Sequence, residues 1–96
     1  MDQIGPFTWD EAKRTSNREK HGVDFSEATH FEMESAVALR DDRKDYGEVR
    51  YRAFGHIKGR LHALVFTWRG SRIRIISLRR ANAREINRYA KKEKSR

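Results

Sequence analysis

The sequence has no cysteine among its 96 residues, which excludes disulfide bonds and thiolate-bound metal ions. Its longest uninterrupted hydrophobic runs, such as residues 63–66, have four members, whereas a membrane-spanning helix needs roughly 20. The N-terminus has no basic segment followed by an apolar one, as a secretion signal would have. We therefore expect no membrane span and no signal peptide, and a cytoplasmic location.

Hydrophobic residues are scarce. They make up 36% of the chain, against 38% for charged residues. A chain of this length buries only roughly 60% of the surface that it exposes when unfolded. Aromatic residues, at 10%, and several apolar clusters nevertheless indicate a packed fold. We expect one domain with a small core.

Negative charge is almost missing from the C-terminal part of the sequence. Of the net charge of +8, residues 69–96 carry +9 and residues 1–68 carry −1. Such a concentrated positive field raises the local concentration of polyanions, and binding through it weakens with salt. A solubilising tail would explain residues 91–96, but in residues 72–88 the cations alternate with apolar side chains. This pattern favours a polyanionic ligand, and RNA is the first candidate.

The N-terminal third predicts two helices. A capping box of Thr8 and Glu11 starts the first helix, which runs for about a dozen residues. Gly22 stands where a left-handed C-terminal cap is expected. A second capping box follows at once and starts a short helix over residues 24–33.

From Ser35 the hydrophobic pattern changes its period to that of strands. Three strand-like stretches occupy residues 48–56, 61–69 and 72–79, and a weaker one occupies residues 36–40. Short turns separate the last three, which predicts an antiparallel meander of four strands.

The chain is predicted to end in a basic helix. Asn82 and Glu85 repeat the capping-box spacing, and residues 83–93 follow with Ile86 and Tyr89 on the inner face. The predicted fold class is therefore α+β, with two N-terminal helices, a four-stranded antiparallel sheet meander and a C-terminal helix. Its expected bounds are a leader over residues 1–6, a single domain over residues 7–90 and a flexible basic tail over residues 91–96.

Metal and cofactor chemistry find little support in the sequence. No two of the four histidines have the close spacing common in zinc sites, and Gly-rich phosphate loops are missing. We predict no metal site and no cofactor. His21, in the last turn of the first helix, is interpreted as interacting with the C-terminal carbonyls of that helix. The acidic residues between Asp41 and Glu48 are interpreted as a solvated loop.

The cationic strand over residues 72–80 is the sharpest functional signal. Strict alternation places Arg72, Arg74 and Arg80 on one face and Arg79 on the other. Arg79 and Arg80 end the strand just before the last helix, so guanidinium groups and free helix-start N–H groups are expected to converge on one anion. The alternative is that these arginines form ion pairs with glutamates, at position 11, 27 or 85.

RNA cleavage without a metal ion needs few groups. One group takes the 2′-hydroxyl proton, cations surround the developing phosphorane, and an acid protonates the leaving oxygen. The residues available for these roles are Arg79, Arg80, Lys20, His62, Tyr89 and Glu11.

Two groups of residues form a pattern that is specific in combination. The first consists of Trp9-Asp-Glu-Ala-Lys13, Asn17, Lys20-His-Gly-Val23, Phe25 and Glu27-Ala28. The second consists of Glu48-x-Arg50, Gly55, Arg72-Ile-Arg-Ile-Ile-Ser77, Arg79-Arg80-Ala81, Glu85 and Tyr89. Over about residues 7–90 this pattern resembles the BrnT toxins.

The resemblance implies a fold similar to that of the RelE-type ribonuclease toxins. It also implies inhibition of translation by RNA cleavage and neutralisation by a cognate BrnA antitoxin. The antitoxin would bring the DNA-binding element, so that operator DNA is bound through the antitoxin in a hetero-oligomer.

The candidate site residues follow from the pattern and the resemblance together. The candidate catalytic residues are Arg79 and Arg80 for charge stabilisation, Tyr89 and Glu11 for proton transfer or orientation, and Lys20 as a further cation. The candidate RNA-binding residues are Arg72, Arg74, Arg84, Arg88, Lys91 and Lys92. Two alternatives explain the charge or the small core: a nonenzymatic basic nucleic-acid-binding module, and a subunit whose exposed surface a protein partner covers.

Overall fold

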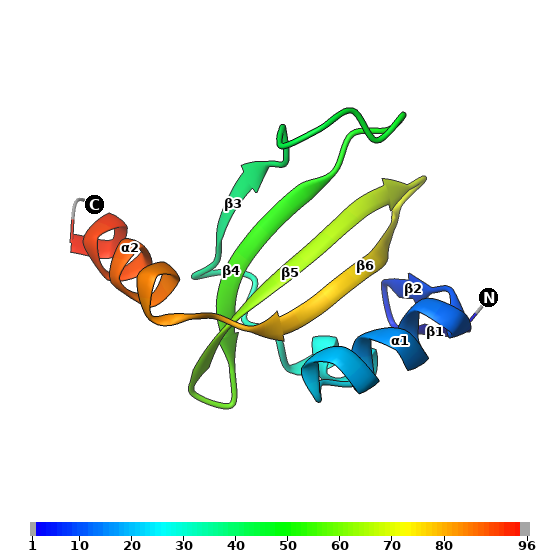
Figure 1. Ribbon diagram of the computed structural model, residues 1–96, viewed down its shortest axis with the longest axis horizontal. Coiled ribbons are helices and arrows are strands. Elements are labelled where there is room, and N and C mark those ends of the chain that lie inside the picture. The colour runs from blue at the N-terminus through cyan, green and yellow to red at the C-terminus, as the bar shows by residue number, and fades with distance from the viewer. Residues whose placement is uncertain (1, 95–96) are drawn as a thin grey trace.

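The computed structural model describes residues 2–94 and shows one sheet with helices at its borders (Figure 1). The elements in chain order are β1 (Asp2–Ile4), β2 (Phe7–Trp9), α1 (Glu11–His21), the 3-10 helix η1 (Phe25–His30), β3 (Val37–Arg40), β4 (Tyr51–Ile57), β5 (Arg60–Arg69), β6 (Arg72–Arg80) and α2 (Ala83–Lys94). No helix within this described part is both long enough and apolar enough to cross a membrane.

The sheet has six strands in the order β1-β2-β6-β5-β4-β3. β3 to β6 form an antiparallel meander, as the sequence predicts. β2 joins the sheet parallel to β6, and β1 pairs with β2. The sequence pattern does not predict these two strands, because three residues are too few to show an alternation. The α+β class is confirmed, and the purely antiparallel sheet is corrected to a mixed one.

Both segments expected to flank the domain contribute to its secondary structure. β1 lies within the expected leader, residues 1–6. In the same segment the carbonyl of Pro6 accepts a hydrogen bond from the Ile73 amide at 2.8 Å. At the other end α2 continues to Lys94, so the expected flexible tail, residues 91–96, begins as helix. Residues 1, 95 and 96 of these two segments lie outside the described residues.

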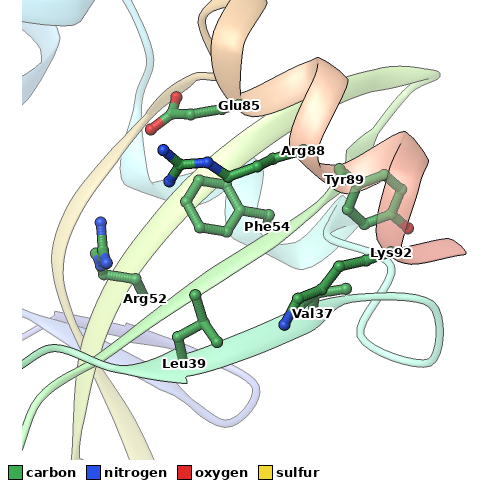
Figure 2. A pocket seen from close by; sticks show the side chains of 8 residues that line it. All are labelled: Val37, Leu39, Arg52, Phe54, Glu85, Arg88, Tyr89 and Lys92. Atoms are coloured by element: carbon green, nitrogen blue, oxygen red, sulfur yellow. The ribbon is translucent and has the colours of Figure 1, made fainter. Parts of the chain in front are cut away.

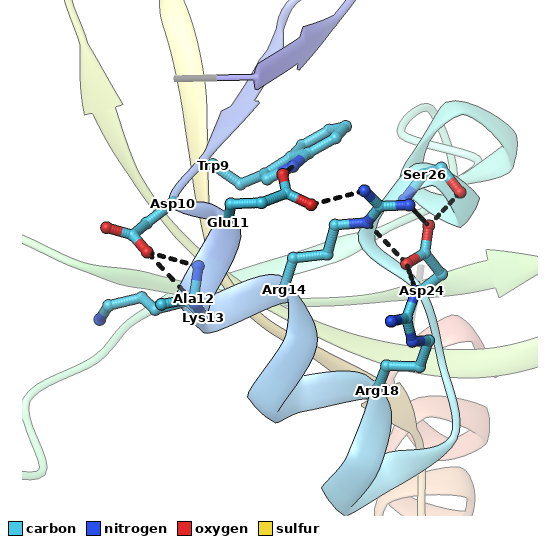
Figure 3. Close-up of polar contacts among 9 residues, drawn as sticks. All are labelled: Trp9, Asp10, Glu11, Ala12, Lys13, Arg14, Arg18, Asp24 and Ser26. Carbon is cyan, nitrogen blue, oxygen red and sulfur yellow. Dashed lines mark hydrogen bonds and ion pairs between the residues drawn. The ribbon is translucent and has the colours of Figure 1, made fainter.

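α1 begins after Asp10, and the capping box expected from Thr8 and Glu11 is wrong. The Asp10 carboxylate accepts the backbone amides of the first turn at 2.8 and 3.2 Å (Figure 3). Thr8 instead lies in β2, where it pairs with β6. The helix ends as predicted, since Gly22 adopts the left-handed conformation with φ 72°.

The short helix predicted over residues 24–33 is the 3-10 helix η1. Asp24 caps its start as expected, accepting the Ser26 amide at 3.2 Å. Phe25 and Ala28 are buried, and the helix ends where Phe31 turns extended and bridges to β4.

One face of the sheet carries the hydrophobic core. The strands β4, β5 and β6 contribute Ala53, Ile57, Leu64, Phe66, Ile73, Ile75 and Leu78, and the N-terminal third contributes Phe7, Trp9, Val23, Phe25, Ala28 and Phe31. Phe25, Leu64, Ile75 and Leu78 have almost no exposed surface. α1 adds no buried apolar side chain to this core, because its one buried residue is an asparagine.

β6 contains a β-bulge opposite the middle of β5. Val65 pairs with Ser77 and Phe66 pairs with Ile75, so Ile76 is an extra residue on this strand. The bulge lies beyond the part of β6 that is paired with β2, because β2 pairs only with the first residues of β6.

The bulge changes which arginines share a face of the sheet. Arg72, Arg74 and Arg79 lie on the face opposite the core, whereas Arg80 lies on the core side, across from His62. The predicted grouping of Arg80 with Arg72 and Arg74 is therefore wrong, because an extra residue reverses the alternation beyond it.

Candidate nucleic-acid interface

α1 is held at the edge of the sheet by Asn17. Its side-chain nitrogen donates to the carbonyls of Leu78 and Val23 at 2.7 and 3.0 Å, and its Oδ1 accepts the Leu78 amide at 3.1 Å. These bonds satisfy backbone groups of β6 that a neighbouring strand would otherwise bind. The buried amide therefore fixes the last turns of α1 beside the β6 bulge.

A hollow lies between the last turns of α1 and the bulge, and we call it the α1 hollow. Its walls include Lys13, Asn17, Lys20 and His21 from α1 and Ile76 and Ser77 from β6. Three of the five α1 residues that line it carry a cationic or imidazole side chain, so the hollow suits a negatively charged ligand.

His21 is partly buried in the α1 hollow. Burial lowers its pKa below the usual 6.5, and the positive charges of Lys20 and Arg79 lower the pKa further. Within residues 2–94 its imidazole makes no hydrogen bond to the protein; the helix is capped instead by the Gly22 amide, which donates to the Arg18 carbonyl at 2.8 Å. The structure therefore does not show the interaction between His21 and the C-terminal helix carbonyls that is expected from the sequence.

A second hollow, the loop hollow, lies on the other side of the bulge. The segment between β3 and β4 and the bulge form its walls, with one residue from β5. The lining residues are Asp41, Arg43, Lys44, Tyr46, Arg50, Val65, Ile76 and Ser77. The bulge therefore forms a wall of both hollows, and cations line both.

The loop hollow is held in shape by a buried carboxylate. The Asp41 side chain is 1% exposed and accepts Arg43 Nε at 2.7 Å and the Tyr46 hydroxyl at 3.1 Å. The bonds from Arg43 hold the pKa of the Asp41 carboxyl well below its usual range. The solvated loop expected here is corrected for Asp41, while Asp42 and Asp45 are exposed.

Arg79 is bound to a carboxylate at the start of α2. Its two terminal nitrogens donate to the Glu85 carboxylate at 2.8 and 2.9 Å, and this pair lowers the pKa of Glu85. The capping box of Asn82 and Glu85 is confirmed by reciprocal bonds of 2.9 and 3.0 Å. The helix-start anion site expected next to Arg79 is thus occupied by Glu85, the ion-pair alternative raised from the sequence.

A groove of mixed character, the α2 groove, separates α2 from β3 and β4 (Figure 2). Val37, Leu39 and Phe54 form its apolar part, and Arg52, Glu85, Arg88 and Lys92 its charged part. The Tyr89 ring also lines the groove, and its hydroxyl donates to the Ser35 carbonyl at 2.6 Å.

The candidate catalytic residues do not all meet. Lys20 and Arg79 lie at the same end of α1, since both charges act on His21, and Arg80 follows Arg79 at the exposed end of β6. Glu11 lies at the opposite end of α1, where it accepts Trp9 Nε1 and Arg14 (Figure 3). Tyr89 lies in the α2 groove.

The remaining candidates are dispersed. Arg72 and Arg74 lie at the start of β6, while Arg84, Arg88, Lys91 and Lys92 are exposed on α2. His62, considered for proton transfer, is buried, and its Nδ1 lies 2.8 Å from the Arg60 carbonyl.

The resemblance allows His21 to be structural or to border the site, and the structure places it in the α1 hollow. Sequence reasoning missed the cations between β3 and β4 that line the loop hollow. For Arg43 and Arg50 the missing information is long-range, because only the pairing of β4, β5 and β6 brings that segment to the bulge. A signal for the bulge itself was present, since the apolar spacing Ile73, Ile75, Leu78 departs from a strict period of two.

These features define a small basic α+β domain in which cations line two hollows at the bulged edge of β6. Among its described residues no three His, Cys, Asp or Glu side chains form a group that could hold a metal ion. The sequence pattern of BrnT, the ribonuclease toxin of type II toxin-antitoxin systems, matches residues 9–85. The chain belongs to this family, which implies an RNA substrate and an antitoxin protein as partner. No curated protein sequence matches the chain.

Proposed function

We propose that the protein is an endoribonuclease that cuts RNA by attack of the 2′-hydroxyl on the adjacent phosphate, without a metal ion, and so inhibits translation. The observation that carries this proposal is the β6 bulge, where Ile76 and Ser77 border both the α1 hollow and the loop hollow. A phosphodiester that crosses the strand edge there meets positive charge on both sides. Ammonium and guanidinium groups can supply charge stabilisation that metal ions supply in other nucleases.

We divide the candidate catalytic residues between two tasks, and their contacts support this division. Lys20, Arg79 and Arg80 are assigned to the phosphate; Arg79 retains N–H groups beyond those that bind Glu85, because a guanidinium has five. Glu11 and Tyr89 are assigned to holding α1 and α2 in place rather than to proton transfer.

The cations of α2 and of the start of β6 are assigned to RNA binding outside the reacting phosphate. They are Arg72, Arg74, Arg84, Arg88, Lys91 and Lys92. Their contribution is long-range attraction, so it falls with ionic strength.

The partner is proposed to be a BrnA-like antitoxin that forms a hetero-oligomer with this chain and carries the operator-binding element. The surface beside the α2 groove supports a protein contact, since Leu39 and Ile86 are 38% and 48% exposed.

The test is cleavage of a labelled single-stranded RNA by the purified, antitoxin-free protein in EDTA. We expect fragments with 2′,3′-cyclic phosphate ends, and no cut at a position where the substrate carries a 2′-deoxyribose. The double variant Arg79→Ala, Arg80→Ala should lose cleavage, whereas Arg79→Lys keeps a cation beside Glu85 and should retain part of it. Arg60→Gln, which removes an exposed cation at the start of β5, is the matched control.

Three outcomes would contradict parts of the proposal. Cleavage that requires added Mg²⁺ contradicts the metal-free mechanism. Full activity in the folded double variant removes the two arginines from the reaction. Salt-sensitive RNA binding without any cleavage favours the nonenzymatic binding module instead.

A further inference from the structure

We propose that His21 is the general base of the cleavage reaction, taking the 2′-hydroxyl proton from an RNA bound across the β6 bulge. This inference rests on the proposed function and names a residue for the step which that proposal leaves unassigned.

The position of His21 is set by a buried anchor rather than by a flexible loop. Asn17, one helical turn before it, is bonded to both backbone groups of Leu78 in β6. His21 is therefore on the same side of α1 as Asn17, since residues four apart lie on one face of a helix. Together with Ile76 and Ser77 of the bulge, His21 lines the α1 hollow.

The imidazole is available for proton transfer. It lies in the wall of the α1 hollow, is partly exposed, and makes no hydrogen bond to any protein group within residues 2–94. By contrast, His62 is buried against the Arg60 carbonyl and His56 packs edge-on against the Tyr89 ring. Among these three histidines, His21 alone combines an accessible ring with a cationic hollow.

The charges around His21 keep it in the basic form. The groups that act on it are Lys20 from its own helix and Arg79 from β6, and Lys13 shares the hollow. All are cationic, so together with burial they favour the neutral imidazole near neutral pH. The same cations attract the phosphate, so one hollow can serve both requirements of the reaction.

The step balances without a further reactant. The 2′-oxygen loses its proton to an imidazole nitrogen of His21 and forms a bond to phosphorus, and the bond from phosphorus to the 5′-oxygen breaks. The leaving 5′-oxygen takes a proton from water, and the imidazolium releases its proton to the solvent. The products are a 2′,3′-cyclic phosphate and a 5′-hydroxyl.

The experiment compares wild type, His21→Ala and His21→Gln on the same labelled RNA between pH 5 and 8, with and without added imidazole. Wild-type kcat should fall with decreasing pH through a pKa below 6.5. Both variants should lose kcat by about 10²-fold to 10⁴-fold, the usual contribution of a general base, with little change in KM. In both variants the decrease of kcat at acidic pH should disappear. Added imidazole should restore part of the rate of His21→Ala. His30→Gln, an exposed histidine in the last turn of η1, is the control.

The outcomes separate this inference from the proposed function. Wild-type-like rates and an unchanged pH profile in His21→Ala, alongside loss of cleavage in the Arg79, Arg80 double variant, overturn the role of His21 alone. A rate loss that imidazole does not restore and that follows a lowered melting temperature also overturns it, since a structural role would produce that result. A wild type that cuts no RNA at any pH overturns both.

Discussion

α1 and α2 are similar in length and both rich in basic residues, yet they attach to the sheet by different means. α1 uses a buried amide, because Asn17 takes the place of a strand at the open edge of β6. α2 uses charge and one aromatic ring, through the Arg79–Glu85 pair and Tyr89. A buried, fully bonded amide fixes position strongly, whereas a groove of charges leaves room for a ligand or a partner.

This contrast matches the roles proposed for the two sides. The proposed reaction needs a base held to within a fraction of an ångström, and the firmly attached helix α1 carries that base. RNA tracking and antitoxin binding tolerate adjustment, and the α2 groove supplies surface for both.

The largest expected effect comes from Asn17→Ala. The substitution leaves the amide of Leu78 and the carbonyls of Leu78 and Val23 without their partner, so the free energy of unfolding should fall by about 3 kcal/mol. Urea unfolding monitored by tryptophan fluorescence measures the change. Asn87→Ala, an exposed asparagine on α2, should change the stability little. Equal losses of unfolding free energy in the two variants would contradict the proposed difference in how the two helices are attached.

Next in size is the effect of separating Arg79 from Glu85. Arg79→Ala leaves a carboxylate whose side chain is only 14% exposed without its partner, and we expect a loss of about 2 kcal/mol. Glu85→Gln should cost about 1 kcal/mol, and the double variant should lose less than the sum. The exposed pair Arg40 and Asp42 is the control and should show almost no coupling in the same double-mutant cycle.

On the α1 side acid should act through Asp24, which binds Arg14 at 2.8 Å, while Asp41 is a second acid-sensitive carboxyl at the loop hollow. Hydrogen bonds from Arg14 lower the pKa of Asp24 to about 2. The unfolded chain binds this proton at higher pH than the folded chain does. Stability from this carboxylate is therefore present above about pH 4 and is lost as pH falls towards 2.

Asp24→Asn keeps a capping side chain for η1 but should remove this part of the pH dependence. The expected change is on the order of 1 kcal/mol after screening by solvent. Thermal unfolding between pH 2 and 5 measures it, with Asp42→Asn as the exposed control. A melting curve for Asp24→Asn as steep in pH as that of wild type would assign the acid sensitivity to other groups.

Much of the fold could be predicted because its signals are local. The N-cap at Asp24, the capping box at residue 82, the cap at Gly22 and the strand periodicity of β4 to β6 each involve neighbouring residues. What was missed depends on residues far apart in the chain. The parallel pairing of β2 with β6 and the bond between Asn17 and Leu78, 61 residues apart, have no local pattern.

The site was predicted in part for the same reason. The sequence pointed to the arginines at the end of β6, and the structure shows two cation-lined hollows a few residues earlier, at Ile76 and Ser77. It could not show that Glu85 rather than a ligand occupies the start of α2, because a capping glutamate and an ion-paired one have the same spacing. Nor could it separate Tyr89 and Glu11 from the cations, which requires the positions of both helices.

The smallest expected effect tests that separation directly. Tyr89→Phe removes the hydroxyl that donates to the Ser35 carbonyl at 2.6 Å but keeps the ring beside His56. We expect a stability loss of about 1 kcal/mol, the net contribution of one hydrogen bond, and RNA cleavage within a few fold of wild type. Urea unfolding and the cleavage assay measure the two quantities on one preparation. If the hydroxyl instead transfers a proton, cleavage falls by orders of magnitude while stability barely changes, and α2 then belongs to the reaction centre beside α1.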